Sequence, residues 1–238
     1  MNGRRTLAPL GRRRVEITAA ERWGGGADER PYLPRAFSYL RARAGELEFL
    51  LEEVGPGTRR LAELRPGDGL WLLGPLGTGF AGPGEGRQAL LVGGGIGIVP
   101  LACWQDELLA AERPAPALLG FRDGAHAEAA SLLAEPRLAT DDGSLGHHGP
   151  VTELLDAHLD AAAEEPEVYA CGPPGMLEAV RLAAAERGVP AQLALEAGMA
   201  CGFGACFGCV VPSRHGYVRL CVDGPVLAAG ELEAVPAP

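Results

Sequence analysis

The chain has 238 residues, of which 47% are hydrophobic, and its 31 acidic and 21 basic side chains give a formal net charge of −10 at pH 7. This length predicts one or two domains with a substantial core, and every apolar run falls short of the about 20 residues that cross a bilayer. All 21 basic residues are arginines, which excludes the lysine-dependent chemistry of P-loops and Schiff bases.

The first residues carry the one basic cluster of the sequence, formed by the arginines at positions 4, 5, 12, 13 and 14. An arm that binds nucleic acid is one interpretation, but a chain start outside the folded domains is favoured, because no aromatic and basic face accompanies it. The apolar segment "TLAPL" is too short for an export signal. We therefore expect a cytoplasmic protein with no nucleic-acid or membrane partner.

Short strands separated by turns are predicted in the N-terminal part. Apolar runs bounded by turn residues predict strands at 14–20, 46–52 and 70–73. "GPGT" (55–58) and "RPGD" (65–68) predict the turns. This pattern favours a small antiparallel β-barrel over residues 1–84, which ends in the glycine-rich linker 81–87.

Strands alternate with helices over residues 85–196. "QALLVGGGIGIVPL" predicts a buried strand, a glycine turn and a helix, and "EVYACGPPGMLEAVRLAAAERG" repeats this pattern up to Gly188. Further strands are expected at 115–121 and 191–196. The alternation predicts a doubly wound parallel sheet. The fold class is therefore α/β plus β, with residues 197–238 as a C-terminal loop domain.

Four of the six cysteines have the spacing C-x4-C-x2-C followed by a distant fourth: Cys201, Cys206, Cys209 and Cys221. In a reducing compartment such a group favours a metal site over disulfides. A [2Fe–2S] cluster needs four thiolates and nearby N–H donors, and the small residues of this loop allow close wrapping. The alternatives are a structural zinc and a set of unrelated thiols. Structural zinc usually takes two C-x2-C pairs, and only Cys206 and Cys209 form one. The spacing is that of plant-type ferredoxins and predicts a [2Fe–2S] site.

Two glycine-rich turns follow predicted strands, at the edge where open α/β sheets bind ligands. The first turn contains Gly94, Gly95 and Gly97 and opens a helix, whose free N–H groups favour a pyrophosphate. A tight turn without a ligand is the alternative. The second turn is "CGPPGM" (171–176), in which Cys171 has the alternative interpretation of a buried structural thiol.

Two further polar segments lie near these turns. Asp123, after the strand at 115–121, is a candidate acceptor for a ribose hydroxyl, and a solvated loop carboxylate is the alternative. "TDDGSLGHHG" (140–149) predicts an ordered turn. His147 and His148 are adjacent and have no third ligand nearby, so we expect no metal site there.

Seven motifs occur in the order found in one family: "PRAFS", "GPGT", "GPLGTGF", "GGGIGIVPL", "TDDGS", "YACGPPGM" and "MACGFGACFGCVV". Together they resemble the electron-transfer subunits of dihydroorotate dehydrogenase B, within the ferredoxin–NADP⁺ reductase superfamily. The resemblance runs from about Arg35 to about Val226. The cysteine loop is specific to this subfamily, whereas "GGGIG" and "CGPP" are shared across the superfamily.

The resemblance implies an FAD-binding β-barrel, an NAD-binding α/β domain and a [2Fe–2S] loop, with FAD, NAD and the cluster as cofactors. It implies that electrons pass from a catalytic subunit, which binds FMN and oxidises dihydroorotate, through the cluster and FAD to NAD⁺ in pyrimidine biosynthesis. The implied assembly is a hetero-oligomer with two copies of each subunit. Phe203 and Phe207 either face this partner or cover the cluster from water.

The resemblance also implies binding residues, taken from the matched motifs. For FAD these are Arg35 toward the phosphates, Phe37 near the ring, Ser38 as a hydrogen-bonding partner, Ala36 between them, and Gly57 and Thr58 at the diphosphate. For NAD they are Gly94, Gly95 and Gly97 in the nucleotide turn, and Cys171, Gly172 and Pro173 beside the nicotinamide. The four clustered cysteines match the iron ligands. Arginine suits a diphosphate because its planar guanidinium donates hydrogen bonds in pairs.

The chain departs from the family pattern in two places. Leu50, Leu51 and Glu52 stand where an aromatic–basic pair usually contributes to the FAD site, and Glu52 cannot donate a hydrogen bond to a phosphate. Only 34 residues precede Arg35, whereas a six-stranded barrel needs about 80–100 residues in all. We therefore expect one or two opening strands to be missing, leaving an exposed strand edge and weaker retention of FAD.

Two other functions remain open at this point. The first is the NAD(P)H-oxidising subunit of a ferredoxin-linked transhydrogenase or sulfide dehydrogenase, which would share the barrel, the turns and the cysteine loop. The second is a regulatory module that binds zinc or a cluster without a flavin.

Overall fold

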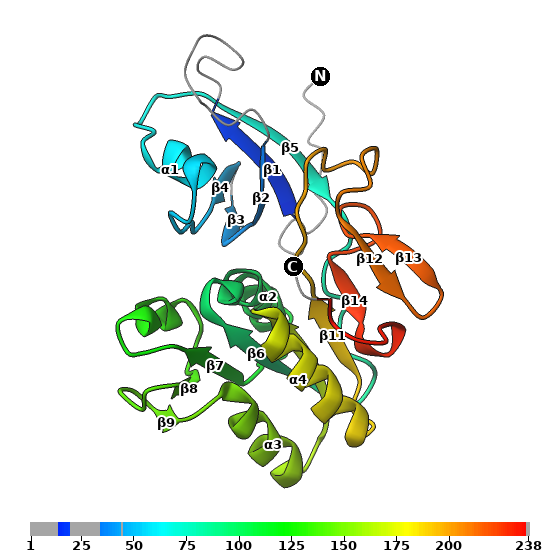
Figure 1. Cartoon of the computed structure of the whole chain (residues 1–238). Helices are drawn as coiled ribbons and strands as arrows, with labels where there is room; N and C mark the ends of the chain where they lie inside the picture. Colours follow the sequence, from blue (N-terminus) through cyan, green and yellow to red (C-terminus); the bar gives the residue numbers. More distant parts are fainter. Residues whose placement is uncertain (1–13, 20–33, 44, 237–238) are drawn as a thin grey trace.

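The N-terminal part of the chain forms short antiparallel strands. The computed structural model describes residues 14–19, 34–43 and 45–236 (Figure 1). The strands of this part are β1 (Arg14–Ala19), β2 (Arg35–Ser38), β3 (Arg41–Arg43), β4 (Glu46–Glu48) and β5 (Leu70–Leu76). They form a three-stranded sheet in the order β2-β1-β5 and a separate β3–β4 hairpin. The predicted strands at 14–20 and 70–73 are confirmed.

The prediction for residues 46–58 is wrong in two respects. The strand covers only Glu46–Glu48 and does not reach Leu50, Leu51 or Glu52. Phe49 packs with the barrel residues around Val15, whereas Leu50 packs with the core of the second domain, so the chain leaves the regular strand.

The predicted turn at "GPGT" is instead the start of helix α1 (Pro56–Ala62). Proline suits the first helical position because its φ is already helical. The Thr58 hydroxyl accepts the N–H of Gly55 at 3.2 Å, which caps the helix start. The turn predicted at 65–68 is confirmed, since Asp68 and Arg65 exchange hydrogen bonds across it.

The described strands of this domain form two separate sheets rather than one closed barrel. Strand β5 lies at the edge of its sheet within the described residues, and the side chains of Leu70, Trp71, Leu72 and Leu73 are 44–61% exposed. Residues 1–13 and 20–33, which precede Arg35, lie outside the described part. The predicted loss of opening strands therefore stays a prediction.

The second domain is a seven-stranded sheet in the order β14-β11-β10-β6-β7-β8-β9. Its strands are β6 (Arg87–Gly94), β7 (Ala117–Phe121), β8 (Arg137–Thr140), β9 (His147–His148), β10 (Glu165–Cys171), β11 (Ala191–Ala194) and β14 (Val226–Ala228). All neighbouring pairs are parallel except β11 and β14. The chain leaves β6 toward β7 on one side and later returns as β10 on the other, which creates a topological switch point between these two strands.

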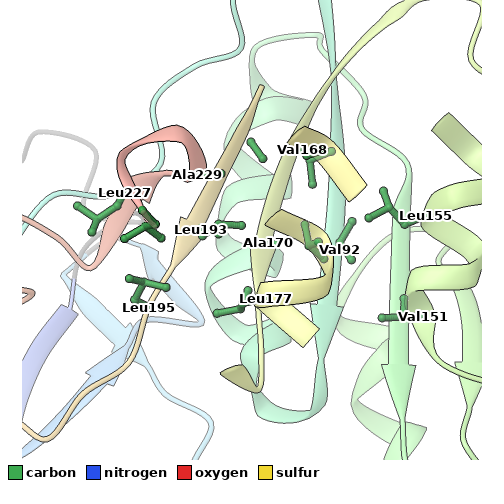
Figure 2. Packing of buried hydrophobic residues seen from close by; sticks show 14 of the residues in the cluster. Val92, Val151, Leu155, Val168, Ala170, Leu177, Leu193, Leu195, Leu227 and Ala229 are labelled. Carbon is green, nitrogen blue, oxygen red and sulfur yellow. The ribbon is translucent and has the colours of Figure 1, made fainter. Parts of the chain in front are cut away.

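Helices cover both faces of this sheet. They are α2 (Ile98–Ala110), α3 (Val151–Ala161) and α4 (Pro174–Glu186), with short 3₁₀ helices at η1 (Gly95–Gly97), η2 (His126–Leu132) and η3 (Ala229–Glu231). Helices α3 and α4 bury Leu155 and Leu177 on one face (Figure 2), whereas α2 buries Leu101 and Trp104 on the other. The doubly wound parallel sheet is thus confirmed. The sequence reasoning did not identify α3, β8 or β9.

The C-terminal part contains the cysteine loop and the hairpin β12 (Val210–Ser213) and β13 (Gly216–Arg219). Strand β14 then joins the edge of the large sheet, so the end of the chain is shared between the predicted second and third domains. The domain limits at 84 and 196 remain predictions. No helix among the described residues is both long and apolar enough to span a membrane.

Candidate functional site

Backbone hydrogen bonds join the four clustered cysteines in two pairs. The N–H of Cys206 donates to Cys201 Sγ, and the N–H of Cys221 donates to Cys209 Sγ, both at 3.4 Å.

Backbone N–H groups point at the sulfur atoms of this loop. Cys201 Sγ accepts N–H groups from Ala205 at 3.3 Å and Cys206 at 3.4 Å, and Cys206 Sγ accepts one from Gly208 at 3.4 Å. Cys209 Sγ accepts the N–H of Cys221 at 3.4 Å. Such donors stabilise negative charge on thiolates and on a cluster.

The two pairs differ in their environment. Hydrogen bonds from the backbone, that of Cys206 first, lower the pKa of Cys201 to about 6. Burial raises the pKa of Cys221 to about 11, and the neighbouring Cys209 adds to this effect. Cys201 is thus favoured as a thiolate near the surface, whereas Cys221 must lose a proton when metal binds.

Across the described residues, no group of three or more His, Cys, Asp or Glu side chains is arranged to hold a metal ion. The preference for a [2Fe–2S] cluster over zinc therefore rests on the C-x4-C-x2-C spacing of the cysteines.

The cysteine loop rests on the first strands of the chain. Gly202 has a φ of +72°, and a Cβ at this position would lie 2.6 Å from Cγ of Glu16 in β1 and 2.9 Å from Cδ1 of Leu76 in β5. Glycine is required there both by the positive φ and by the close approach. The loop thus covers one face of β1, while Val15 and Ile17 are buried on the other.

The structure brings the predicted diphosphate residues together. The guanidinium of Arg35, at the start of β2, lies directly over Gly57 in α1, where a Cβ would overlap Nε. Thr58 uses its hydroxyl to cap the same helix. An arginine beside a helix start suits an anionic group such as a diphosphate, and the assignment of these residues to FAD stays a prediction.

The other predicted FAD residues are not all in one place. Ala36, Phe37 and Ser38 follow Arg35 on β2, and the Phe37 ring contacts that of Phe49 at 6.3 Å. Leu50 packs against the second domain, and Leu51 and Glu52 lie in an irregular segment, where Glu52 is exposed. Phe49, which the sequence reasoning passed over, is the aromatic residue next to Phe37.

The two predicted nucleotide turns meet at the switch point between β6 and β10. Gly93 pairs with Cys171, so the turns after both strands are adjacent. A Cβ at Gly97 would lie 2.6 Å from the Cys171 carbonyl oxygen and 2.7 Å from Gly172 Cα, and one at Gly94 would lie 2.9 Å from Pro173 Cδ. Gly95, with a φ of +53°, is exposed and meets nothing within 4 Å, which leaves its backbone open to a ligand.

Polar loops follow the neighbouring strands at the same edge of the sheet. Asp123 Oδ1 accepts the backbone N–H of His126 at 3.0 Å and lies 2.7 Å from His126 Nδ1, and these hydrogen bonds lower the pKa of Asp123. Ser144, in the next loop, donates to Asp142 and accepts the N–H of Gly124. The predicted ordered turn is thus held by its own side chains. His147 pairs with Glu153 at 2.6 Å.

Two solved structures with this fold are described as a ferredoxin-NADP oxidoreductase and a ferredoxin reductase. The NADH-dependent reduced ferredoxin-NADP oxidoreductase, described for flavin-based electron bifurcation, matches with a TM-score of 0.78 and 26% identity, over 96% of this chain and 80% of that chain. The ferredoxin reductase of carbazole 1,9a-dioxygenase matches with a TM-score of 0.61 and 29% identity, over 76% of this chain and 57% of that one. The fold and the cysteine loop thus define an iron–sulfur protein of the ferredoxin–NADP⁺ reductase class.

Sequence relatives identify the family within this class. Residues 196–233 match the model of the iron–sulfur cluster binding domain of dihydroorotate dehydrogenase B. The electron transfer subunit of dihydroorotate dehydrogenase B (NAD(+)) from Bacillus caldolyticus is 40% identical over 208 residues, which are 84% of this chain and 79% of the relative. That from Desulforamulus reducens is 38% identical over 196 residues, 79% of this chain and 74% of the relative. The chain belongs to the family of dihydroorotate dehydrogenase B electron-transfer subunits.

Sequence reasoning missed Glu16, which is 1% exposed. The alternation in "RVEITAA" places Val15 and Ile17 on one face of β1 and assigns Glu16 to the opposite, solvated face. That face is instead covered by a loop from the far end of the chain. The residues next to Glu16 in the sequence do not predict its contact with the cysteine loop.

Proposed function

We propose that the chain carries electrons from a dihydroorotate-oxidising partner subunit to NAD⁺, as the electron-transfer subunit of an NAD-dependent dihydroorotate dehydrogenase in pyrimidine biosynthesis. The observation that carries this proposal is the position of the cysteine loop on β1. Gly202 packs on Glu16 of that strand, and the neighbouring residue Val15 pairs with Phe37 in β2. The cluster loop and the predicted flavin strand are therefore attached to the same small sheet.

FAD and the cluster, when bound, supply the redox chemistry, in which single electrons and a hydride are both handled. The chain's own residues position and stabilise these groups. Arg35 over Gly57 offers paired donors to a diphosphate, and the N–H groups of Ala205 and Cys206 stabilise negative charge on Cys201 Sγ. The glycine turns at the switch point leave bare backbone where a nucleotide can approach.

The partner surface that we propose surrounds the cysteine loop. Phe203, Phe207 and Tyr217 are 64%, 63% and 80% exposed, and the Arg219 guanidinium lies 5.7 Å from the centroid of the Phe207 ring. Aromatic and arginine side chains of this kind are enriched at protein interfaces. All six cysteines are free thiols, which agrees with a reducing compartment, and we place the protein in the cytoplasm.

An alternative is the NAD(P)H-oxidising subunit of a ferredoxin-linked transhydrogenase, since a ferredoxin-NADP oxidoreductase structure shares the fold at a TM-score of 0.78. The identity to that protein is 26%, against 40% for the dihydroorotate dehydrogenase B relative, which favours our proposal. Co-purification with a dihydroorotate-oxidising protein would decide between them.

The test compares Cys206→Ser with Cys103→Ala. Cys103 is a buried thiol in α2, outside the cysteine loop. We expect Cys206→Ser to abolish the electron paramagnetic resonance signal of the reduced cluster and the dihydroorotate-dependent reduction of NAD⁺ in the complex, yet to keep most NADH-to-dye activity. Cys103→Ala should retain all three. Loss of dye reduction together with the cluster signal in Cys206→Ser would contradict separate flavin and cluster sites.

A further inference from the structure

An ion-pair group joins the barrel to the NAD-binding domain at the β3–β4 hairpin. Arg41 Nε and Arg43 Nη2 both donate to Oδ2 of Asp106 in α2, at 3.1 and 2.8 Å. Arg41 also lies 3.9 Å from Glu48, its neighbour across the hairpin. Figure 1 shows the hairpin next to α2. One carboxylate thus holds two cations from a segment more than sixty residues away in sequence.

This contact is partly shielded and has an apolar base. The side chains of Arg41 and Asp106 are 24% and 34% exposed. Leu40, directly before Arg41, is buried in the same cluster as Leu101 and Trp104 of α2. The apolar contact holds the two domains together. The ion pairs set the orientation of the hairpin relative to α2, because hydrogen bonds depend on geometry more strongly than apolar packing does.

The elements joined by this contact lead directly to the two cofactor sites. Toward the N-terminus, only Tyr39 and Leu40 separate Arg41 from β2, which carries the predicted flavin residues. On the other side, α2 begins at Ile98, immediately after the nucleotide turn, and Asp106 lies about two turns along that helix. A shift of the hairpin on α2 would therefore move the flavin strand relative to the nucleotide turn.

We propose that Asp106 is a positioning residue for hydride transfer: by binding Arg41 and Arg43 it holds the flavin-binding barrel in register with the NAD-binding turn. The inference rests on the proposed function, since it assigns the two sites to FAD and NAD. Hydride transfer needs the reacting rings in contact, and a displacement of about 1 Å can lower such a rate by about a hundredfold.

The test uses Asp106→Asn, which keeps the shape and removes the charge, and Asp106→Glu, which restores a carboxylate. Asp160→Asn is the control, because Asp160 pairs with Arg187 at 2.9 Å inside the NAD-binding domain. For Asp106→Asn we expect the limiting rate of flavin reduction by NADH to fall about tenfold, with bound FAD and the cluster spectrum unchanged. Amide hydrogen exchange in residues 40–48 of the as-isolated protein should become faster. Asp106→Glu should recover part of the rate, and Asp160→Asn should match the wild type.

A second variant approaches the same contact from the barrel. Arg41→Gln combined with Arg43→Gln should reproduce the Asp106→Asn phenotype, and adding Asp106→Asn should cause little further loss, because the groups act as one unit. Wild-type flavin reduction in Asp106→Asn, or loss of FAD together with the rate, would overturn a positioning role. If the wild type is not reduced by NADH, the proposed function fails instead. The hydrogen-exchange comparison then decides separately whether Asp106 holds the hairpin.

Discussion

Replacing Gly97 with alanine should disturb the predicted NAD site, because the added Cβ would push two neighbouring turns apart. The added Cβ would lie 2.6 Å from the Cys171 carbonyl oxygen and 2.7 Å from both Cys171 C and Gly172 Cα, all of them backbone atoms that cannot rotate away. Ordinary contacts begin near 3.4 Å, so the two turns must separate by most of an ångström. Overpacking of this kind costs about 1–3 kcal/mol, which corresponds to a fall in Tm of roughly 2–12 °C for a chain of this size.

The assay pairs thermal unfolding with NADH titration, and Gly175→Ala is the matched control. Gly175 lies in the first turn of α4, and a Cβ there meets nothing within 4 Å. Alanine should therefore be neutral or stabilise the helix by up to about 1 kcal/mol. We expect Gly97→Ala to raise the KM for NADH while the bound FAD and the cluster signal persist. An unchanged Tm and KM in Gly97→Ala would refute the idea that close packing of the turns shapes this site.

Three further substitutions or modifications test single residues. Gly57→Ala should displace the Arg35 guanidinium and weaken FAD binding by about 10- to 100-fold, measured by flavin release, whereas Gly55→Ala, which meets nothing within 4 Å, should not. In the cluster-free protein, alkylation of Cys201 should rise with pH through about 6, because its lowered pKa makes it a thiolate above that pH, while Cys221 with a pKa of about 11 stays a thiol; equal labelling of both at pH 7 would contradict this. Asp123→Asn should raise the KM for NADH about tenfold if its carboxylate accepts a ribose hydroxyl, and steady-state kinetics at fixed dye concentration would measure it.

The large sheet and its turns were predictable because their signals are local. The runs "ALLVGG" and "VYAC" are hydrophobic throughout, as strands buried on both faces must be, and the glycines after them occupy positions where backbone meets backbone. The cysteine spacing was equally informative, because three of the four predicted ligands lie within nine residues, from Cys201 to Cys209. Helix α3 was not predicted from the sequence. It follows Pro150 and has no side-chain cap that would mark its start.

The remaining features depend on contacts between distant segments. The strand predicted at 46–52 ends early because Phe49 and Leu50 pack into different cores, and no periodicity within seven residues encodes that. Asp106 and Arg41 look like ordinary surface charges on a helix and a strand until the fold brings them within 3.1 Å. Segment 81–87, predicted as a linker, is tied to the sheet, since Glu167 accepts the N–H of Gly84 and Gln192 exchanges hydrogen bonds with Ala81.

The packing of Gly202 against Glu16 and Leu76 sets the order in which parts of the protein can form. The platform is made from β1 and β5, which are synthesised before the loop that rests on them. The loop cannot take its shape until both have been synthesised and have met. The cluster can therefore be inserted only after the chain from β1 to Cys221 has been synthesised.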